Sequence, residues 1–300
     1  MNKSQHKYSG ILTALPTPLT ADLQIETAPL VAHVQRLAQG GATDGVVPLG
    51  GTGEYTSLSA SQRLQIVEAT LAAAGDTMHV IPGILSPGVG DAIDNARAFV
   101  RAGAKALMVV TPYYFRPTQE GILDYYKRFS DAVDADIILY EIPYRTGVSL
   151  HYGTVDKLAD MTRVVGIKAC NPDLAQQMRA AELASTKMAI LTGEEDVAPL
   201  HIAMGAVGAV ISSSNLVPNQ WQRVLGLAME GKLAESVALH ATLRPLIDAI
   251  FAEPNPAPLK LAMNLLGWGF GPDVLPPMQA GSAALRARLE QVVPALISRE

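Results

Sequence analysis

Short apolar segments alternate with longer amphipathic segments along most of this chain, and this order limits the possible folds more than any other feature of the sequence. The apolar segments have the length of β-strands, and the segments between them carry apolar residues at helical spacing. Strands that alternate with helices form parallel sheets, because a parallel pair of strands needs a long crossover connection. Eight strands are predicted, at residues 11–14, 45–49, 78–82, 106–110, 137–141, 164–168, 188–192 and 208–211.

Helices are predicted between these strands and after the last of them. Thr27 is a candidate N-cap of the first helix, and Gly75 ends the second. The order predicts an α/β fold, a (β/α)8 TIM barrel over residues 1–217, with active-site loops at the carboxyl ends of the strands. Residues 218–300 show helices without a strand signal and are predicted to form a C-terminal helical subdomain. The predicted helices are 27–39, 59–74, 89–101, 119–132, 154–159, 174–184, 198–204, 220–229, 233–251, 259–266 and 283–297.

The composition argues against several classes of partner and cofactor. A net charge of −5 without a cluster of basic residues disfavours nucleic acid and anionic membranes as partners. Cys170 is the single cysteine and the six histidines are scattered, so we expect no disulfide, no metal site and no cofactor. Pro16 and Pro18 interrupt the first apolar stretch, and no later run has the length of a membrane span. The sequence predicts a cytoplasmic protein that acts on small molecules.

A lysine stands at the end of the predicted strand 164–168. Lys168 follows the apolar residues Val164, Val165 and Ile167. Desolvation in such a strand lowers the pKa of an amine, and a neutral amine can attack a carbonyl carbon to form a Schiff base. The structural alternative is a lysine that reaches from the strand end into solvent. Lys168 is therefore a candidate nucleophile for making or breaking carbon-carbon bonds without a metal.

Three loops that follow predicted strands carry polar or glycine residues, and in a barrel they would face one cavity. Gly51 and Thr52 lie in a glycine-rich loop whose backbone N–H groups can converge on a carboxylate, although such a loop can also be an ordinary tight turn. The second loop holds two adjacent tyrosines, the latter being Tyr114. The third carries the phenol of Tyr140 and the guanidinium of Arg145, which can bind a carboxylate bidentately. Tyrosines on barrel strands serve packing or, beside a Schiff-base lysine, proton transfer.

Five motifs together resemble those of the dihydrodipicolinate synthase and N-acetylneuraminate lyase family of class I aldolases, in the family's order and near its spacing. The resemblance covers nearly the whole chain. It implies a lyase that forms a Schiff base with pyruvate or a related 2-oxo acid. The motifs are Gly50-Gly51-Thr52-Gly53-Glu54, Thr111-Pro112-Tyr113-Tyr114, Tyr140-Glu141-Ile142-Pro143, Gly166-Ile167-Lys168 and Gly193-Glu194-Glu195-Asp196.

The resemblance also implies roles for single residues. By it, Lys168 forms the Schiff base and Tyr140 transfers protons. The backbone of Gly51 and Thr52 holds the carboxylate of the 2-oxo acid, and Ile211 lines the same pocket.

The family is typically tetrameric, and the resemblance extends to that property. Tyr114 is similar to the tyrosine that reaches into the neighbouring subunit's site. The expected partners are therefore a small 2-oxo acid substrate and further copies of this chain in a homotetramer.

Departures from the family pattern give opposite indications about the second substrate. Dihydrodipicolinate synthases have a threonine in place of Gly51, and its hydroxyl links two tyrosines in a proton relay; a glycine there is more similar to dehydratases and aldolases of deoxy-keto sugar acids. Arg145 stands where the synthases bind the carboxylate of aspartate semialdehyde. Glu195 and Asp196 match an acidic pair that holds substrate hydroxyls in the sialic acid lyases, or they complement a helix dipole.

The sequence predicts a class I lyase that condenses pyruvate with an aldehyde such as aspartate semialdehyde, as dihydrodipicolinate synthases do. A 2-keto-3-deoxy sugar acid aldolase or dehydratase is the alternative. A catalytically silent homologue that binds a 2-oxo acid is a third hypothesis, disfavoured because Lys168, Tyr140 and Thr52 are all present. A metal-dependent aldolase on the same fold is disfavoured by the lack of grouped ligands.

Overall fold

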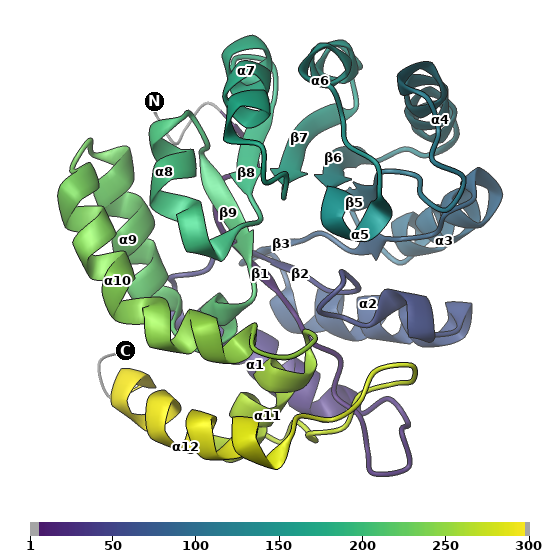
Figure 1. The fold of residues 1–300 in the computed structure, drawn as a ribbon. Helices are drawn as coiled ribbons and strands as arrows, with labels where there is room; N and C mark the ends of the chain where they lie inside the picture. The colour runs from purple at the N-terminus through teal and green to yellow at the C-terminus, as the bar shows by residue number, and fades with distance from the viewer. Residues whose placement is uncertain (1–5, 298–300) are drawn as a thin grey trace.

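The computed structural model describes residues 6–297, and within them nine parallel strand segments form one curled sheet with helices around it (Figure 1). The order in the sheet is β3-β2-β1-β9-β8-β7-β6-β5-β4. The segments are β1 Gly10–Ala14, β2 Gly45–Val47, β3 His79–Val80, β4 Gly83–Ile84, β5 Ala106–Val110, β6 Asp136–Glu141, β7 Val164–Ala169, β8 Ala189–Thr192 and β9 Gly208–Ile211.

The two outermost segments, β3 and β4, are parts of one stretch of chain that is interrupted at Pro82. Proline has no backbone N–H and interrupts the hydrogen-bond ladder. Pairing nevertheless continues through the break, because the Ile81 N–H donates to the Val46 carbonyl at 2.9 Å and the Met108 N–H donates to the Pro82 carbonyl at 2.9 Å. The two ends of the sheet therefore meet, and the nine segments make the eight strands of the predicted barrel.

The helices follow the sequence pattern closely, with differences at their ends. Ser59 caps α2 rather than starting it, through a capping box with Gln62. Thr27 is the first residue of α1, not its N-cap; Glu26 takes the cap position without a side-chain bond. The helices are α1 Thr27–Gly40, α2 Ala60–Ala74, α3 Val89–Arg101, α4 Gln119–Ala132, α5 Pro143–Thr146, α6 Tyr152–Ala159, α7 Leu174–Ala184, α8 Ala198–Ala203, α9 Pro218–Met229, α10 Leu233–Ile250, α11 Ala257–Leu265 and α12 Ala283–Ile297.

Alternation along each strand divides the buried side chains into two layers. On β6, Ile137 and Leu139 pack in the outer layer beneath the helices, whereas Ile138 and Tyr140 point into the barrel interior. The inner layer is filled by side chains, as in other barrels of this size. Polar side chains that face inward near the carboxyl ends of the strands therefore lie next to this close-packed inner layer.

The C-terminal helices α10, α11 and α12 pack against one another beside the barrel (Figure 1). The chain between α11 and α12 returns to the turn after β2, where the Ser57 hydroxyl donates to the Pro276 carbonyl at 3.0 Å. The division of the chain after residue 217 remains a prediction, and residues 1–5 and 298–300 of the two predicted domains lie outside the described residues. None of the helices within residues 6–297 combines the length and apolar character that crossing a membrane requires.

Candidate active site

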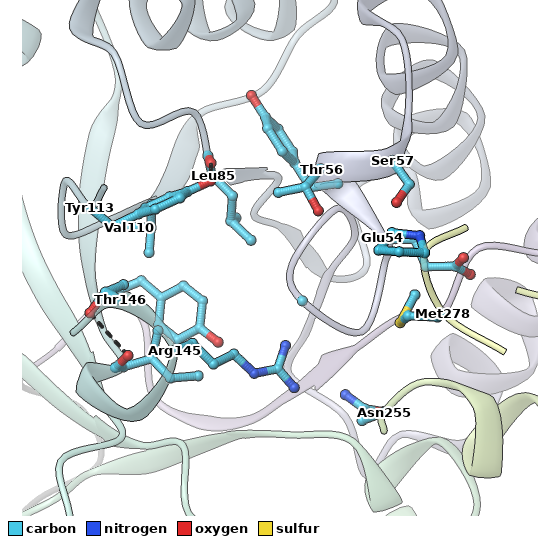
Figure 2. A pocket seen from close by; sticks show the side chains of 15 residues that line it. Glu54, Thr56, Ser57, Leu85, Val110, Tyr113, Arg145, Thr146, Asn255 and Met278 are labelled. Carbon is cyan, nitrogen blue, oxygen red and sulfur yellow. Dashed lines mark hydrogen bonds between the residues drawn. The ribbon is translucent and has the colours of Figure 1, made fainter. Parts of the chain in front are cut away.

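A pocket of about 260 Å³ opens at the carboxyl ends of β5 and β6 (Figure 2). Its walls come from the turn after β2, from these strand ends, from α5 and from two parts of the C-terminal region. The carboxyl end of a barrel is where substrates bind in enzymes of this architecture. The residues that line the pocket are Gly51, Glu54, Tyr55, Thr56, Ser57, Leu85, Val110, Tyr113, Tyr140, Ile142, Arg145, Thr146, Asn255, Pro277 and Met278.

Lys168 and Tyr140 lie side by side on the neighbouring strands β7 and β6. The Nζ atom of Lys168 is 4.5 Å from the centre of the Tyr140 ring, and both side chains are buried. Ile167 and Ala169 pack in the outer layer, so alternation turns the Lys168 side chain toward the barrel interior. The structure thus brings together the two residues for which the sequence predicts Schiff-base formation and proton transfer.

Burial and neighbouring charges act in opposite directions on the pKa of Lys168. Burial has the largest effect and lowers this pKa, and the charge of Arg145 lowers it further. Negative charge on Tyr140, Cys170 and Glu194 raises it. The net result is a pKa above the usual value of a lysine. Burial also raises the pKa of Tyr140, and it raises the pKa of Cys170 to about 12, so both groups are neutral near pH 7. Glu194 is then the carboxylate that opposes burial and Arg145 at neutral pH.

Gly193, which follows β8, provides the space that the Lys168 side chain occupies. A Cβ atom at position 193 would lie 2.7 Å from the Cε atom of Lys168 and would also collide with the Sγ atom of Cys170. Both side chains would have to move to make room for it. The glycine of the Gly193-Glu194-Glu195-Asp196 motif therefore positions the amine, which the sequence motif alone did not indicate.

The turn after β2 has an unusual backbone that packs closely against Gly53. Leu49 and Glu54 adopt left-handed conformations, with φ of 61° and 59°. Gly53 packs against the start of the same turn, and a Cβ atom there would lie 2.5 Å from the backbone nitrogen of Leu49. Because backbone cannot yield as a side chain does, Gly53 has to be glycine.

The same turn holds two backbone N–H groups without a partner among the described residues, those of Gly51, which lines the pocket, and of Thr52, which does not. The Thr52 hydroxyl lies 3.0 Å from the Ser212 hydroxyl and accepts a hydrogen bond of 2.9 Å from the Asn255 amide, which together fix the side chain. The backbone N–H groups of Gly51 and Thr52 donate to no other residue in the described part of the chain. Convergent free N–H groups of this kind can bind a carboxylate.

A buried ion pair connects this turn to the C-terminal helices. The Nζ atom of Lys260 lies 2.9 Å from Glu54 Oε1, and both side chains are fully buried. Glu54 Oε2 accepts a hydrogen bond of 2.6 Å from the backbone N–H of Leu275. Burial lowers the pKa of Lys260, and the charge of Glu54 opposes that effect. The carboxylate of Glu54 therefore binds three parts of the chain together.

Arg145 lies on α5, a single helical turn that begins at Pro143 and was not predicted because of its shortness. Its guanidinium extends into the pocket toward Asn255 (Figure 2). Arg145 is the only cationic side chain among the described residues that line the pocket. The described lining of the pocket therefore carries one positive charge, and carboxylate binding by Arg145 stays a prediction.

Tyr114 does not line this pocket. Its side chain is 81% exposed, its φ is 77°, and its ring contacts the ring of Phe115, which is 89% exposed. The preceding Tyr113 lines the pocket instead and donates a hydrogen bond of 2.9 Å to the Leu85 carbonyl. A catalytic role for Tyr114 therefore requires a second copy of the chain and stays a prediction.

The acidic pair lies away from the pocket. Glu195 is buried, and one of its carboxylate oxygens accepts hydrogen bonds of 2.6 and 3.0 Å from the backbone of Ser212 and Ser213. Asp196 forms an ion pair with Arg244. Neither residue lines the pocket, and their predicted binding of substrate hydroxyls stays a prediction without support from these contacts.

The predicted position of Ile211 in the pocket has to be corrected by one residue along β9. The structure places Ile211 in the outer core layer, whereas the preceding residue, Val210, belongs to the inner layer. Successive residues of a strand point to opposite faces, so an error of one residue reverses the side. Ile211 packs beneath the helices and does not line the pocket.

Most of the lining residues were not predicted, and three of them come from the region predicted as a separate helical subdomain. Asn255, Pro277 and Met278 close the pocket opposite α5. The sequence held one indication that this region contacts the barrel, because the charged Lys260 interrupts the otherwise apolar stretch from Leu259 to Met263. No group of three or more His, Cys, Asp or Glu residues within residues 6–297 is arranged to hold a metal ion.

Comparison with known proteins identifies the family. Residues 7–296 match the model of the dihydrodipicolinate synthetase family. The chain belongs to this family. A 4-hydroxy-tetrahydrodipicolinate synthase of Acidiphilium cryptum is 35% identical over 263 residues, which cover 87% of this chain and 89% of that protein.

Solved members of the dihydrodipicolinate synthetase family have the same fold. The crystal structure of dihydrodipicolinate synthase from Thermotoga maritima has a TM-score of 0.92 and 30% identity, covering 97% of this chain and 99% of that one. That of the chloride-inhibited enzyme from Acinetobacter baumannii, complexed with pyruvate, has a TM-score of 0.90 and 27% identity, covering 95% and 97%. The predicted family, its lyase class and the TIM-barrel fold are confirmed.

Lys260→Met is expected to lower the free energy of unfolding by about 3–5 kcal/mol, because it leaves the carboxylate of Glu54 buried without a counter-charge. Urea denaturation at fixed protein concentration measures the loss. Lys260→Met combined with Glu54→Gln removes the isolated charge and should recover part of it. A double variant that is less stable than Lys260→Met would contradict this account.

Glu194→Gln is expected to lower the pKa of Lys168, because Glu194 raises it. Below its pKa the amine is protonated and cannot attack, so the onset of pyruvate-dependent borohydride trapping should move to lower pH. Initial trapping rates from pH 7 to 11, a range that extends to the ordinary pKa of a lysine, measure the shift, and Glu194→Asp, which keeps the charge, is the control. An onset that moves to higher pH would show that Glu194 does not act on Lys168 in this way.

Proposed function

We propose that this chain condenses pyruvate with aspartate semialdehyde through a Schiff base on Lys168. The observation that carries the proposal is the contact between the Lys168 amine and the Tyr140 ring, buried at the carboxyl end of the barrel. The free N–H groups of Gly51 and Thr52 support a carboxylate site, and Arg145 supports a second. The names of the relatives agree with this activity.

In the proposed first half-reaction, the neutral amine of Lys168 attacks the carbonyl carbon of pyruvate while the turn at Gly51 and Thr52 binds the carboxylate. The resulting carbinolamine loses water and becomes the imine. Tyr140 donates the proton that the departing hydroxyl needs. Its phenol is suited to this role because burial keeps it protonated near pH 7.

In the second half-reaction, loss of a proton from the methyl group of bound pyruvate gives an enamine. The enamine carbon attacks the aldehyde carbon of the second substrate, and the aldehyde oxygen takes a proton as the carbon-carbon bond forms. The amino group of aspartate semialdehyde then attacks the imine carbon, closes the ring and releases Lys168. Arg145 orients the second substrate through its carboxylate.

The sugar acid alternative has less support in this pocket. Glu195 and Asp196, which suggested a polyhydroxylated substrate, are engaged with Ser212, Ser213 and Arg244. Several pocket walls are apolar, formed by residues such as Leu85, Val110, Ile142 and Met278. A pocket with apolar walls and one cation suits a short acidic aldehyde better than a sugar acid.

We further propose that the protein is a cytoplasmic homotetramer in which Tyr114 of one subunit reaches the pocket of another. The support is the exposure of both Tyr114 and Phe115 on one turn beside the pocket. Large aromatic side chains exposed together commonly mark interaction surfaces.

Lys168 should be the residue trapped when the protein is reduced with borohydride in the presence of pyruvate. Intact mass is expected to show one pyruvate adduct in the parent and none in Lys168→Ala. Tyr140→Phe should still form the adduct but turn over about a hundred- to ten-thousandfold more slowly, because proton transfer needs the phenol. A pyruvate adduct that persists in Lys168→Ala, or near-parental turnover in Tyr140→Phe, would refute the assigned roles.

Arg145→Ala is expected to raise the Michaelis constant for aspartate semialdehyde about ten- to a hundredfold and to leave pyruvate trapping nearly unchanged. A charged hydrogen bond to a carboxylate contributes about 1.5–3 kcal/mol, which corresponds to that range. Steady-state rates with aspartate semialdehyde and with a panel of sugar acids test the substrate at the same time. Turnover of a sugar acid in preference to the aldehyde would favour the alternative function.

A further inference from the structure

Glu195 is a buried acidic residue that the proposed mechanism does not use. Its side chain is 4% exposed, and Oε1 accepts hydrogen bonds of 2.6 and 3.0 Å from the backbone N–H groups of Ser212 and Ser213. The Ser213 hydroxyl donates to Oε2 and accepts a hydrogen bond of 2.6 Å from the indole N–H of Trp221. Glu195 thus holds the start of the loop that follows β9.

Ser212, the first residue of this loop, is fixed on both sides of its side chain. Glu195 binds its backbone N–H, and its carbonyl accepts a hydrogen bond of 2.7 Å from the side-chain amide of Asn215. Because both backbone groups have partners, the direction of the Ser212 side chain is set. Its hydroxyl lies 3.0 Å from the hydroxyl of Thr52, so Glu195 is connected to the turn after β2 through Ser212.

The hydrogen bonds of Thr52 determine what its hydroxyl can offer a ligand. A hydroxyl has one proton to donate and two positions at which it accepts. The Asn255 amide occupies one accepting position at 2.9 Å, and Ser212 can occupy the other. Thr52 then has no acceptor for its own proton in the described part of the chain. A carboxylate bound by the N–H groups of Gly51 and Thr52 only accepts, so it favours this arrangement, in which Thr52 donates to the ligand.

We propose that Glu195 and Ser212 are positioning residues that direct the Thr52 hydroxyl to the carboxylate of the 2-oxo acid. The inference rests on the proposed function, because it takes the turn at Gly51 and Thr52 as the carboxylate site. Both residues act on the affinity for the carboxylate and not on the attack by Lys168. A carbonyl compound without a carboxylate should therefore not respond to changes at either position.

The test measures initial rates of borohydride trapping in the full chain with pyruvate and with acetone, a ketone that lacks the carboxylate. Ser212→Ala should raise the pyruvate concentration for half-maximal trapping about three- to tenfold, because it removes the orientation of the charged hydrogen bond and not the donor itself. The maximal rate with pyruvate and the rate with acetone should stay nearly unchanged. Thr52→Val removes the donor and should raise the same concentration about ten- to a hundredfold. Ser212→Ala should have no further effect in the Thr52→Val background.

Glu195→Gln tests the connection one step further from the ligand. It keeps the length of the side chain but leaves one oxygen to accept hydrogen bonds, so the loop after β9 should be held less firmly. The half-maximal concentration of pyruvate should rise as in Ser212→Ala, and acetone should again be unaffected. In the Ser212→Ala background, Glu195→Gln should not raise it further, and an additive effect would contradict the assigned role of Glu195.

Ser214→Ala is the matched control in the same loop, because the Ser214 hydroxyl donates to Thr13 Oγ1 at 2.9 Å and to the Ile211 carbonyl at 3.0 Å and does not contact Thr52. It should leave pyruvate trapping unchanged. Pyruvate binding that is unchanged or tighter in Ser212→Ala, an equal loss with acetone, or an equal loss in Ser214→Ala would each overturn this inference alone. A parent that pyruvate does not label would overturn the proposed function together with it.

Discussion

The ion pair between Lys260 and Glu54 is the interaction on which the site depends most. Removing two charges from water is unfavourable, and a fully buried pair persists only where its geometry and additional hydrogen bonds compensate. Here Glu54 also accepts the backbone N–H of Leu275, so one carboxylate connects the turn after β2, helix α11 and the chain that leads to α12. The turn after β2 and the chain that leads to α12 also carry walls of the pocket, and Asn255, just before α11, lines it as well. The C-terminal region therefore contributes to the shape of the site as well as to the stability of the protein.

The second buried lysine, Lys168, has a different environment. Lys260 has a carboxylate 2.9 Å away, whereas Lys168 lies against the face of the Tyr140 ring. A carboxylate in direct contact favours the charged form of an amine strongly, and an aromatic ring does so only weakly. Burial thus accompanies a structural ion pair at one position and, at the other, an amine for which no direct ion pair is seen among the described residues. The same residue type serves the fold in one place and is proposed to serve chemistry in the other, and the partner that each strand or helix provides makes the difference.

The sequence predicted the parts of this molecule that local periodicity determines. All eight barrel strands and the predicted helices occur near their expected positions, because apolar alternation and helical spacing are local properties. Features that depend on register or on distant contacts were wrong or missed. Ile211 points outward because the face of a strand changes with every residue, and a motif does not fix that phase. Asn255 reaches the pocket from just before α11, and Pro277 and Met278 reach it because the chain after α11 folds back to the turn after β2, which local periodicity does not predict.

The glycines of the site show why a motif needs a structure before it can be interpreted. Gly53 is required by the backbone of Leu49, Gly193 by the side chains of Lys168 and Cys170, and Gly51 by neither of these constraints. A substitution at Gly53 would deform the turn itself, and one at Gly193 would displace the amine. At Gly51 it would displace only the guanidinium of Arg145, which is free to move. A small side chain at position 51 is therefore compatible with the backbone of the turn, provided that the guanidinium of Arg145 moves.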